Sequence, residues 1–193
     1  MSILDKNEKE VLLKSARASI LNALGPAPGK DDGIVSDPKI RNLKTPRGCF
    51  VTLTIRGRLR GCIGTIEPIM PLIDGIVQNA RKAAFDDPRF APVTEDEMKQ
   101  VDIEVSVLTP PRRLDFTDPE DLKKQLVPGK HGVIIHREGR SAVFLPQVWK
   151  QLPKTEQFLE NLCLKCSLPA DAWKKPGTEV SVYEAEYFSE TDS

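Results

Sequence analysis

The strictest pattern in this chain is an alternation of apolar and polar residues between residues 101 and 109. The apolar positions are 101, 103, 105 and 107, and the polar side chains between them are Asp102, Glu104 and Ser106. A period of two places the two sets of side chains on opposite faces of an extended strand. The pattern therefore predicts a strand that is buried on one face only.

Two hairpins are predicted on similar grounds, over residues 49–63 and 132–145, the second turning at residues 137–140. In the first hairpin, a three-residue loop over residues 56–58 keeps every aliphatic side chain on one face. The pairs across the hairpin are then Ile55 with Leu59, Thr54 with Arg60, and Thr52 with Cys62. This register places Arg60 and Cys62 on the face that carries the threonines.

Helical periodicity predicts helices over residues 5–24, 71–85 and 155–166, and a short helix that Thr94 and Glu97 cap. A last strand is expected over residues 178–188. Hairpins interspersed with helices indicate an α+β fold with a mostly antiparallel sheet. We expect one domain over residues 1–193 with two interleaved lobes, and a long surface connection over residues 25–48. The order hairpin-then-helix occurs twice, which suggests two related units, although no sequence repeat supports a duplication.

Charge and hydropathy argue against several classes of protein. The chain has 28 basic and 28 acidic side chains, so a broad electrostatic surface for nucleic acid or anionic membrane is not expected. The N-terminus is polar and charged and lacks the apolar segment of a signal peptide. No apolar run is long enough to cross a bilayer. We therefore expect a soluble, cytoplasmic protein.

The best candidate for chemistry is the string Leu-Arg-Gly-Cys-Ile-Gly-Thr at residues 59–65. Gly61 and Gly64 lie on either side of Cys62, and glycines let a backbone or a ligand come close. Arg60 supplies a nearby cation, which favours a thiolate over a thiol. Cys62 is therefore predicted to be a nucleophile at the centre of a cleft, with Arg60, Gly61 and Gly64 binding the substrate.

Other polar residues complete this hypothesis of a cysteine-dependent enzyme. His131, one of only two histidines, is predicted to be the general acid or base, and Glu104, or Asp102, to orient it. Arg89 and Gln147 are predicted to bind an anionic or carbonyl substrate. The reaction class is the transfer of an acyl or similar group from an activated carbonyl.

Each of these residues also has a structural explanation. Cys62 is explained as a packed side chain at a bulge shaped by glycines, and Glu104 as a solvated carboxylate. His131 is explained as a partner of a loop carbonyl, and Arg89 as the ion-pair partner of an aspartate in its own turn. The alternative function is a non-catalytic module that binds a protein or a small ligand. A third is nucleic-acid binding through the arginines around the first hairpin.

The other three cysteines, Cys49, Cys163 and Cys166, are expected to be free thiols. Cys163-x-x-Cys166 has the spacing of a redox or zinc motif, but it lies in an apolar, helix-like stretch without a second such pair. We therefore expect small packed side chains at these positions, and neither a metal nor a cofactor.

Several strings of the sequence together resemble a known family. They cover residues 59–64, 85–93, 103–110, 130–133, 144–148 and 158–165. In this order they resemble the AMMECR-type domain family, the protein A component of AmmeMemoRadiSam systems, over nearly the whole chain. The resemblance implies an α+β fold with two related strand–helix units around a curved sheet with flanking helices. It also implies partners of the Memo and radical-SAM types, and it assigns no activity. Family members usually carry alanine at the position of Cys166, which argues against a paired role for Cys163 and Cys166.

Overall fold

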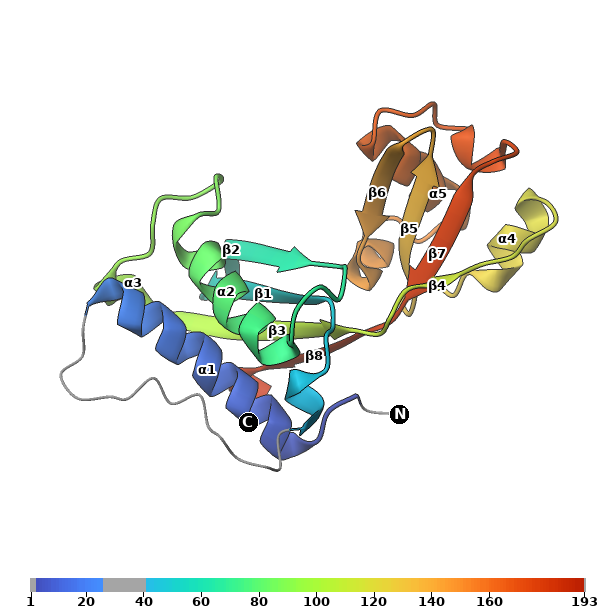
Figure 1. The fold of residues 1–193 in the computed structure, drawn as a ribbon. Coiled ribbons are helices and arrows are strands. Elements are labelled where there is room, and N and C mark those ends of the chain that lie inside the picture. The colour runs from blue at the N-terminus through green and yellow to red at the C-terminus, as the bar shows by residue number, and fades with distance from the viewer. Residues whose placement is uncertain (1–2, 26–40, 193) are drawn as a thin grey trace. The chain divides into compact units, whose positions relative to one another are not determined.

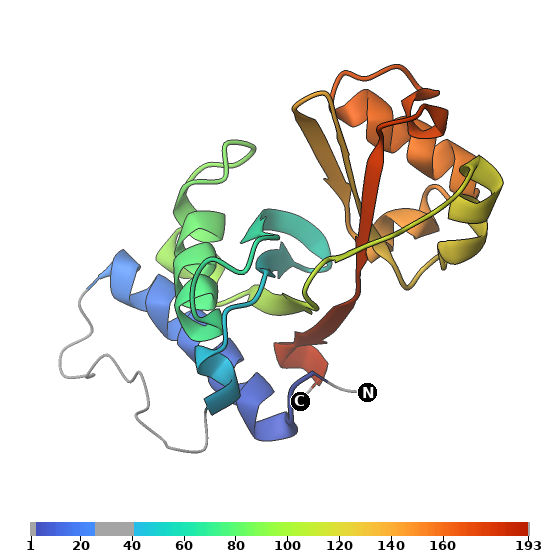
Figure 2. The same cartoon turned by 45° about the vertical axis from the view of Figure 1, so that its right-hand side comes forward.

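The computed structural model describes residues 3–25 and 41–192, and these residues form two compact units (Figures 1 and 2). The first unit holds the described residues up to Leu108 together with the C-terminal segment from Glu186, and the second holds Thr109–Ala185. Each unit has its own four-stranded sheet and its own hydrophobic core. The predicted α+β class is confirmed, and the strands divide between two sheets. Most of the predicted surface connection, at residues 26–40, lies outside the described residues.

The sheet of the first unit has the strand order β2-β1-β3-β8. Its strands are β1 (Cys49–Ile55), β2 (Arg58–Thr65), β3 (Val101–Leu108) and β8 (Ala185–Ser189). Its helices are α1 (Lys6–Leu24), α2 (Leu72–Phe85) and the short α3 (Glu95–Met98), with 3-10 turns at Arg41–Lys44 and Glu190–Asp192. Strand β1 pairs antiparallel with both β2 and β3. Helices α1 and α2 lie side by side on one face of this sheet (Figure 1).

Alternation and capping explain these elements locally. Val51, Leu53, Ile103 and Val105 are fully buried and form the core with the helices. Because the side chains of a strand alternate, the polar residues between them lie on the other face of the sheet. Both α1 and α3 begin with the reciprocal bonds of a capping box, and the Thr94–Glu97 box is the predicted one.

The predicted loop of the first hairpin is wrong. The turn has two residues, Arg56 and Gly57, with φ values of 52° and 73°, which fit the twist of a tight hairpin. The register shifts between Leu53 and Thr54, so an extra residue in β2 forms a β-bulge. The observed pairs are therefore Thr54 with Leu59 and Ile55 with Arg58, whereas the predicted pair of Thr52 with Cys62 is confirmed. As a result, Leu59 lies on the polar face and is 43% exposed.

The sheet of the second unit has the order β4-β7-β5-β6. Its strands are β4 (Arg112–Arg113), β5 (Gly132–Arg137), β6 (Arg140–Phe144) and β7 (Glu179–Tyr183). Its helices are α4 (Pro119–Gln125) and α5 (Thr155–Lys165), with 3-10 turns at Pro146–Lys150 and Ala172–Lys174. The Trp149 ring stacks on Phe158 in its core, at a centroid distance of 3.7 Å. Helix α4 was not predicted, although Asp118 caps it and Pro119 opens it.

The single strand predicted over residues 178–188 is two strands in two different sheets. The chain leaves β7 at Tyr183 and enters β8 at Ala185. At the break, the N–H of Glu184 donates to the Thr109 hydroxyl and the Glu184 carbonyl accepts from the Thr109 N–H. An alternating pattern of apolar and polar residues predicts an extended backbone, but it does not predict which sheet the strand joins. Among the described residues, we find no helix with the length and apolar character needed to span a membrane.

Candidate functional site

The sheet of the first unit carries a row of polar side chains on the face opposite α1 and α2. We call Cys62, Thr52, Glu104 and Tyr187 the polar row. Thr52 lies opposite Cys62 on one side and opposite Glu104 on the other. Tyr187 follows on β8, where the next residue, Phe188, points into the core on the helix side. Each of the four strands thus contributes one residue to the polar row.

Cys62 lies on the edge strand β2, and its thiol is partly exposed. The Thr52 hydroxyl donates a hydrogen bond to the Cys62 sulfur at 3.3 Å. The main-chain N–H of Cys62 donates to the Asp87 carboxylate at 2.9 Å, and its carbonyl accepts from the Arg89 guanidinium at 3.3 Å. The sheet edge is therefore closed at Cys62 by two side chains instead of another strand.

Asp87 and Arg89 form the clamp that closes this edge. The Arg89 guanidinium donates to both carboxylate oxygens of Asp87, at 2.9 and 2.7 Å. These bonds, with the N–H of Cys62, hold the pKa of Asp87 well below its usual range, although burial opposes the shift. The Asp87 side chain is 2% exposed and that of Arg89 is 53% exposed. The ion pair predicted as the structural explanation of Arg89 is confirmed, and sequence reasoning did not anticipate the contact with Cys62.

Arg60 has different partners from those that the sequence suggested. It lies at the β-bulge, and its guanidinium bonds to the Glu97 carboxylate at 2.8 and 3.0 Å and to the Ala91 carbonyl at 2.8 Å. Hydrogen bonding to Arg60 lowers the pKa of Glu97 to about 2. Arg89, in contrast, bonds to the main chain of Cys62, and its pKa is raised by Asp87 and to a smaller extent by Cys62. The cation that contacts Cys62 is therefore Arg89, through the main-chain carbonyl.

Close packing accounts for both glycines of the string. A Cβ atom on Gly61 would lie 2.1 Å from the main-chain oxygen of Ala83, so this glycine lets α2 approach the sheet. A Cβ atom on Gly64 would lie 2.2 Å from the Phe50 ring, which occupies that space on the polar face. The predicted close approach is thus made by a backbone at Gly61 and by an aromatic ring at Gly64.

Tyr187 is a member of the site that sequence reasoning missed. Its hydroxyl oxygen is buried and has no hydrogen-bond partner within residues 3–25 and 41–192. Burial raises the pKa of this phenol, and the negative charge of Glu104 raises it further. The available signal was weak: Tyr187 is one of only two tyrosines, and it takes a polar position in the alternation of residues 178–188.

The other two predicted site residues belong to the second unit. His131 is 8% exposed, and its Nδ1 accepts a hydrogen bond from the N–H of Val127 at 3.2 Å. The imidazole thus satisfies a loop amide, where a loop carbonyl was the expected partner, and burial lowers its pKa. Gln147 has a buried side-chain oxygen without a partner among the described residues. The structure places Cys62 and Glu104 on one face of a sheet, and the participation of His131 and Gln147 stays a prediction.

The remaining cysteines are free thiols with structural surroundings. Cys49 is buried beside Asn79, and burial raises its pKa to about 11. Cys163 is also buried, which raises its pKa. The Cys166 thiol donates to the Cys163 carbonyl at 3.3 Å at the C-terminal end of α5. Helix C-termini disfavour negative charge, so this motif lacks the setting of a reactive pair.

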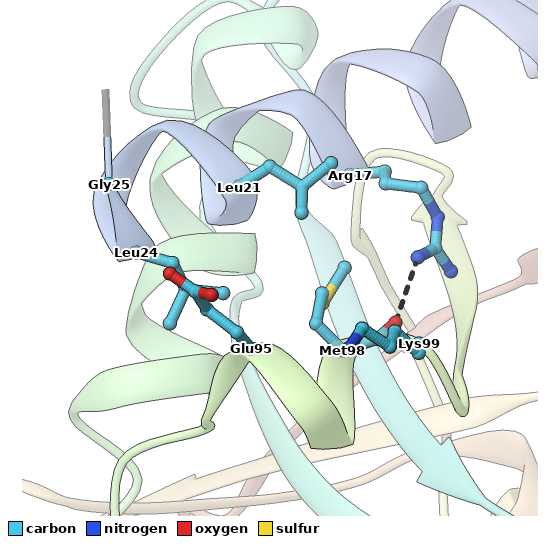
Figure 3. Close-up of a pocket in the computed structure, with 7 residues that line it drawn as sticks. All are labelled: Arg17, Leu21, Leu24, Gly25, Glu95, Met98 and Lys99. Atoms are coloured by element: carbon cyan, nitrogen blue, oxygen red, sulfur yellow. Dashed lines mark hydrogen bonds between the residues drawn. The ribbon is translucent and has the colours of Figure 1, made fainter. Parts of the chain in front are cut away.

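A pocket in the first unit lies between α1 and α3 and contains none of the predicted site residues (Figure 3). Leu21 and Leu24 line it from α1, and Met98 from α3. The Arg17 guanidinium at its side donates to the Met98 carbonyl at 3.3 Å and forms an ion pair with Glu190. Arg17 thus fastens the C-terminal segment to α1, which is a structural role.

Comparison with known proteins finds similar sequences over nearly the whole chain. A model of the AMMECR1 family matches residues 13–188. Protein MK0488 of Methanopyrus kandleri is 41% identical over 96% of this chain and 89% of its own length. Protein MJ0810 of Methanocaldococcus jannaschii is 40% identical over 100% of this chain and 94% of its own.

A solved structure supports the same relationship. The crystal structure of the uncharacterised protein PH0010 from Pyrococcus horikoshii is 34% identical to the chain, with a TM-score of 0.84. The match covers 98% of this chain and 94% of that one. Both the sequence and the fold are therefore those expected from the motif strings, and the chain belongs to the AMMECR1 family.

Proposed function

We propose that the polar row is an active site in which Cys62 is the nucleophile. The observation that carries this proposal is the set of contacts around Cys62: the Thr52 hydroxyl donates to its sulfur, and the Arg89 guanidinium bonds to its main-chain carbonyl. Both interactions stabilise negative charge on sulfur. Cys166, the other partly exposed cysteine, has the opposite arrangement, because its thiol donates to a carbonyl at a helix C-terminus.

The reaction class that suits this arrangement is acyl transfer from an activated ester or thioester. The Cys62 sulfur attacks the carbonyl carbon, a C–S bond forms, and the bond from that carbon to the leaving group breaks. The thiol loses its proton to solvent before the attack, and the Thr52 hydroxyl donates to the thiolate that remains. The leaving group departs as the alcohol or thiol after taking up a proton. An acceptor nucleophile or water then releases the acyl group and restores the thiol.

Cysteine alkylation in the folded protein tests the nucleophile. The four cysteines are treated with iodoacetamide at pH 7, and the labelled peptides are followed by mass spectrometry. We expect Cys62 to react first, Cys166 more slowly, and the buried Cys49 and Cys163 only after unfolding, because reactivity needs both exposure and thiolate character.

Variants of the two threonines on β1 identify the cause of that reactivity. Thr52→Val removes the hydroxyl that donates to sulfur, and we expect slower alkylation of Cys62. Thr54→Val is the matched control, because Thr54 lies on the same face but opposite Leu59. Equal rates at Cys62 and Cys166 in the native protein would refute the proposal.

A further inference from the structure

The two tyrosines of the chain differ in what their hydroxyls contact. The Tyr183 hydroxyl donates to the Phe144 carbonyl at 3.2 Å, as buried phenols usually do. The Tyr187 hydroxyl is buried on the polar row without a partner among the described residues. A buried polar group without a hydrogen bond costs about 1–3 kcal/mol, so such a group in a native fold calls for an explanation.

We propose that Tyr187 binds the substrate of the site at Cys62, donating a hydrogen bond from its hydroxyl to an oxygen atom of an extended acyl compound. This inference rests on the proposed function and adds the shape and chemistry of the substrate. Because burial and the charge of Glu104 raise the pKa of the phenol, Tyr187 keeps its proton at neutral pH. A protonated phenol donates to a carbonyl or amide oxygen, which is the group that an acyl compound offers.

The position of Tyr187 limits the length of the substrate. Cys62 and Tyr187 lie on β2 and β8, the two edge strands of the sheet, with β1 and β3 between them. Strands are spaced by about 4.8 Å, so the two main chains are about 14 Å apart. Side chains shorten this span, but a substrate that touches both the sulfur and the hydroxyl is much longer than an acetyl group. A short peptide or a substituted acyl chain has the required length.

The charge between the two ends limits the chemistry of the substrate. Glu104 lies on β3 between Thr52 and Tyr187, and its charge acts on the phenol. A carboxylate at this point repels an anionic group in the middle of the substrate and tolerates a neutral or cationic one. The inferred substrate is therefore an extended acyl compound that carries amide or carbonyl oxygens and no negative charge along its length.

Two activated esters of different length test the inference. The first is p-nitrophenyl acetate, which reaches only Cys62, and the second is the p-nitrophenyl ester of N-acetylglycylglycine, whose amide oxygens extend along the row. Acylation of Cys62 is measured by mass spectrometry in the full chain, in Tyr187→Phe and in Tyr183→Phe. We expect Tyr187→Phe to slow acylation by the long ester about tenfold, which is the loss of one hydrogen bond, and to leave the short ester unaffected.

Thermal unfolding of the same variants provides the structural control. Tyr183→Phe removes a hydroxyl that has a partner, so it should lower Tm without changing either acylation rate. Tyr187→Phe should leave Tm unchanged or raise it, because no hydrogen bond within the described residues is lost.

The possible failures are distinguishable. If neither ester acylates Cys62, the proposed function fails and the inference fails with it. If the short ester reacts and the long one does not, or if Tyr187→Phe affects both esters alike, the inference is overturned while the nucleophile stands. A fall in Tm for Tyr187→Phe equal to that of Tyr183→Phe would also overturn it, by showing that the hydroxyl has a structural role.

Discussion

The two sheets contain the same hairpin with different residues. The turns Arg56-Gly57 and Glu138-Gly139 have φ values of 52° and 73° and of 53° and 72°, and in each case the second strand is an edge of its sheet. Counted from the turn along the paired residues, Cys62 and Val143 take the same place on β2 and β6. The first hairpin has a β-bulge before this place, and no register shift occurs in the second.

The residues beside this place differ in polarity. In the first sheet the row continues from Cys62 to Thr52 and Glu104, and in the second it continues from Val143 to Ile134 and Ser181. The second hairpin thus has two aliphatic residues and a serine at these places, so a hairpin of this kind forms without the thiol and the carboxylate of the first unit. This difference is the structural argument that the polar row is functional.

The two edges are also closed differently. At Cys62, the clamp of Asp87 and Arg89 satisfies both the N–H and the carbonyl. At Val143, the Lys165 ammonium donates to the carbonyl at 2.8 Å. A buried carboxylate thus binds the edge of the strand that carries the thiol, whereas the Val143 carbonyl on β6 is contacted by an exposed lysine.

The largest expected effect on stability comes from Gly61, the residue just before Cys62; its equivalent before Val143 is Ala142. Gly61→Ala places a methyl group 2.1 Å from the Ala83 oxygen, and the main chain has to move. We expect a loss of about 3 kcal/mol in the free energy of unfolding, measured in urea by circular dichroism. The control is Ala142→Gly at the equivalent place, which removes a methyl group and should cost about 1 kcal/mol. Equal losses would show that the two helix–sheet contacts are alike.

The clamp gives the next largest effect. Asp87→Asn removes the charge that holds Arg89 and weakens the acceptor for the N–H of Cys62, so we expect a loss of about 2 kcal/mol. Lys165→Met, the control on β6, removes one exposed donor and should cost less than about 1 kcal/mol. Urea unfolding of both variants measures the difference. A cost at Lys165 as large as that at Asp87 would contradict the claim that the edge at Cys62 is held more firmly.

A pH series tests whether the charge of Asp87 is responsible for the stability that Asp87→Asn loses. The pKa of Asp87 is lower in the folded protein than in the unfolded chain, where an aspartate has a pKa of about 3.9. Its stabilisation is therefore complete well above that value, begins to decline as the pH falls below it, and is lost as the pH falls through the lower pKa of the folded state. Between pH 7 and pH 3, the native protein should lose more stability than Asp87→Asn, and the two curves should approach each other. Parallel curves would exclude the ionised Asp87 carboxylate as the source of this pH-dependent stability.

Much of this architecture could be predicted from short-range patterns. Alternation gave β3 and both hairpins, and the spacing of Thr94 and Glu97 gave the cap of α3. The facing pair Thr52 and Cys62 could also be predicted, because it depends only on the period of two. The two-residue turn could not be predicted, because arginine seldom adopts the positive φ found at Arg56. The bulge at Arg60, which accompanies this turn, could not be predicted either.

The surroundings of Cys62 depend on residues that are distant in the sequence. Arg89 reaches the Cys62 carbonyl across 27 positions, and Asp87 reaches its N–H across 25. Tyr187 joins the same sheet from the end of the chain, after a strand that belongs to the other sheet. Proximity along the sequence favoured Arg60 as the cation, but Arg60 bonds to Glu97 and the Ala91 carbonyl, whereas Arg89 bonds to the Cys62 carbonyl. Only the strand order shows which polar residues share a face.

The smallest expected effect on stability comes from exchanging the two compared residues. Cys62→Val gives the first sheet the side chain that the second already has, so we expect the free energy of unfolding to change by less than about 0.5 kcal/mol. Urea unfolding measures this, and a loss of several kcal/mol would favour Cys62 as a packing residue.

The reciprocal change, Val143→Cys, separates the polar row from the cation. Lys165 contacts the Val143 carbonyl much as Arg89 contacts that of Cys62, so the new thiol would have a neighbouring cation but Ile134 and Ser181 in place of Thr52 and Glu104. If the polar row activates the sulfur, iodoacetamide should label this thiol much more slowly than Cys62. Equal rates would mean that a strand edge and a cation are sufficient, and the difference between the two rows would then no longer argue for the function of the first.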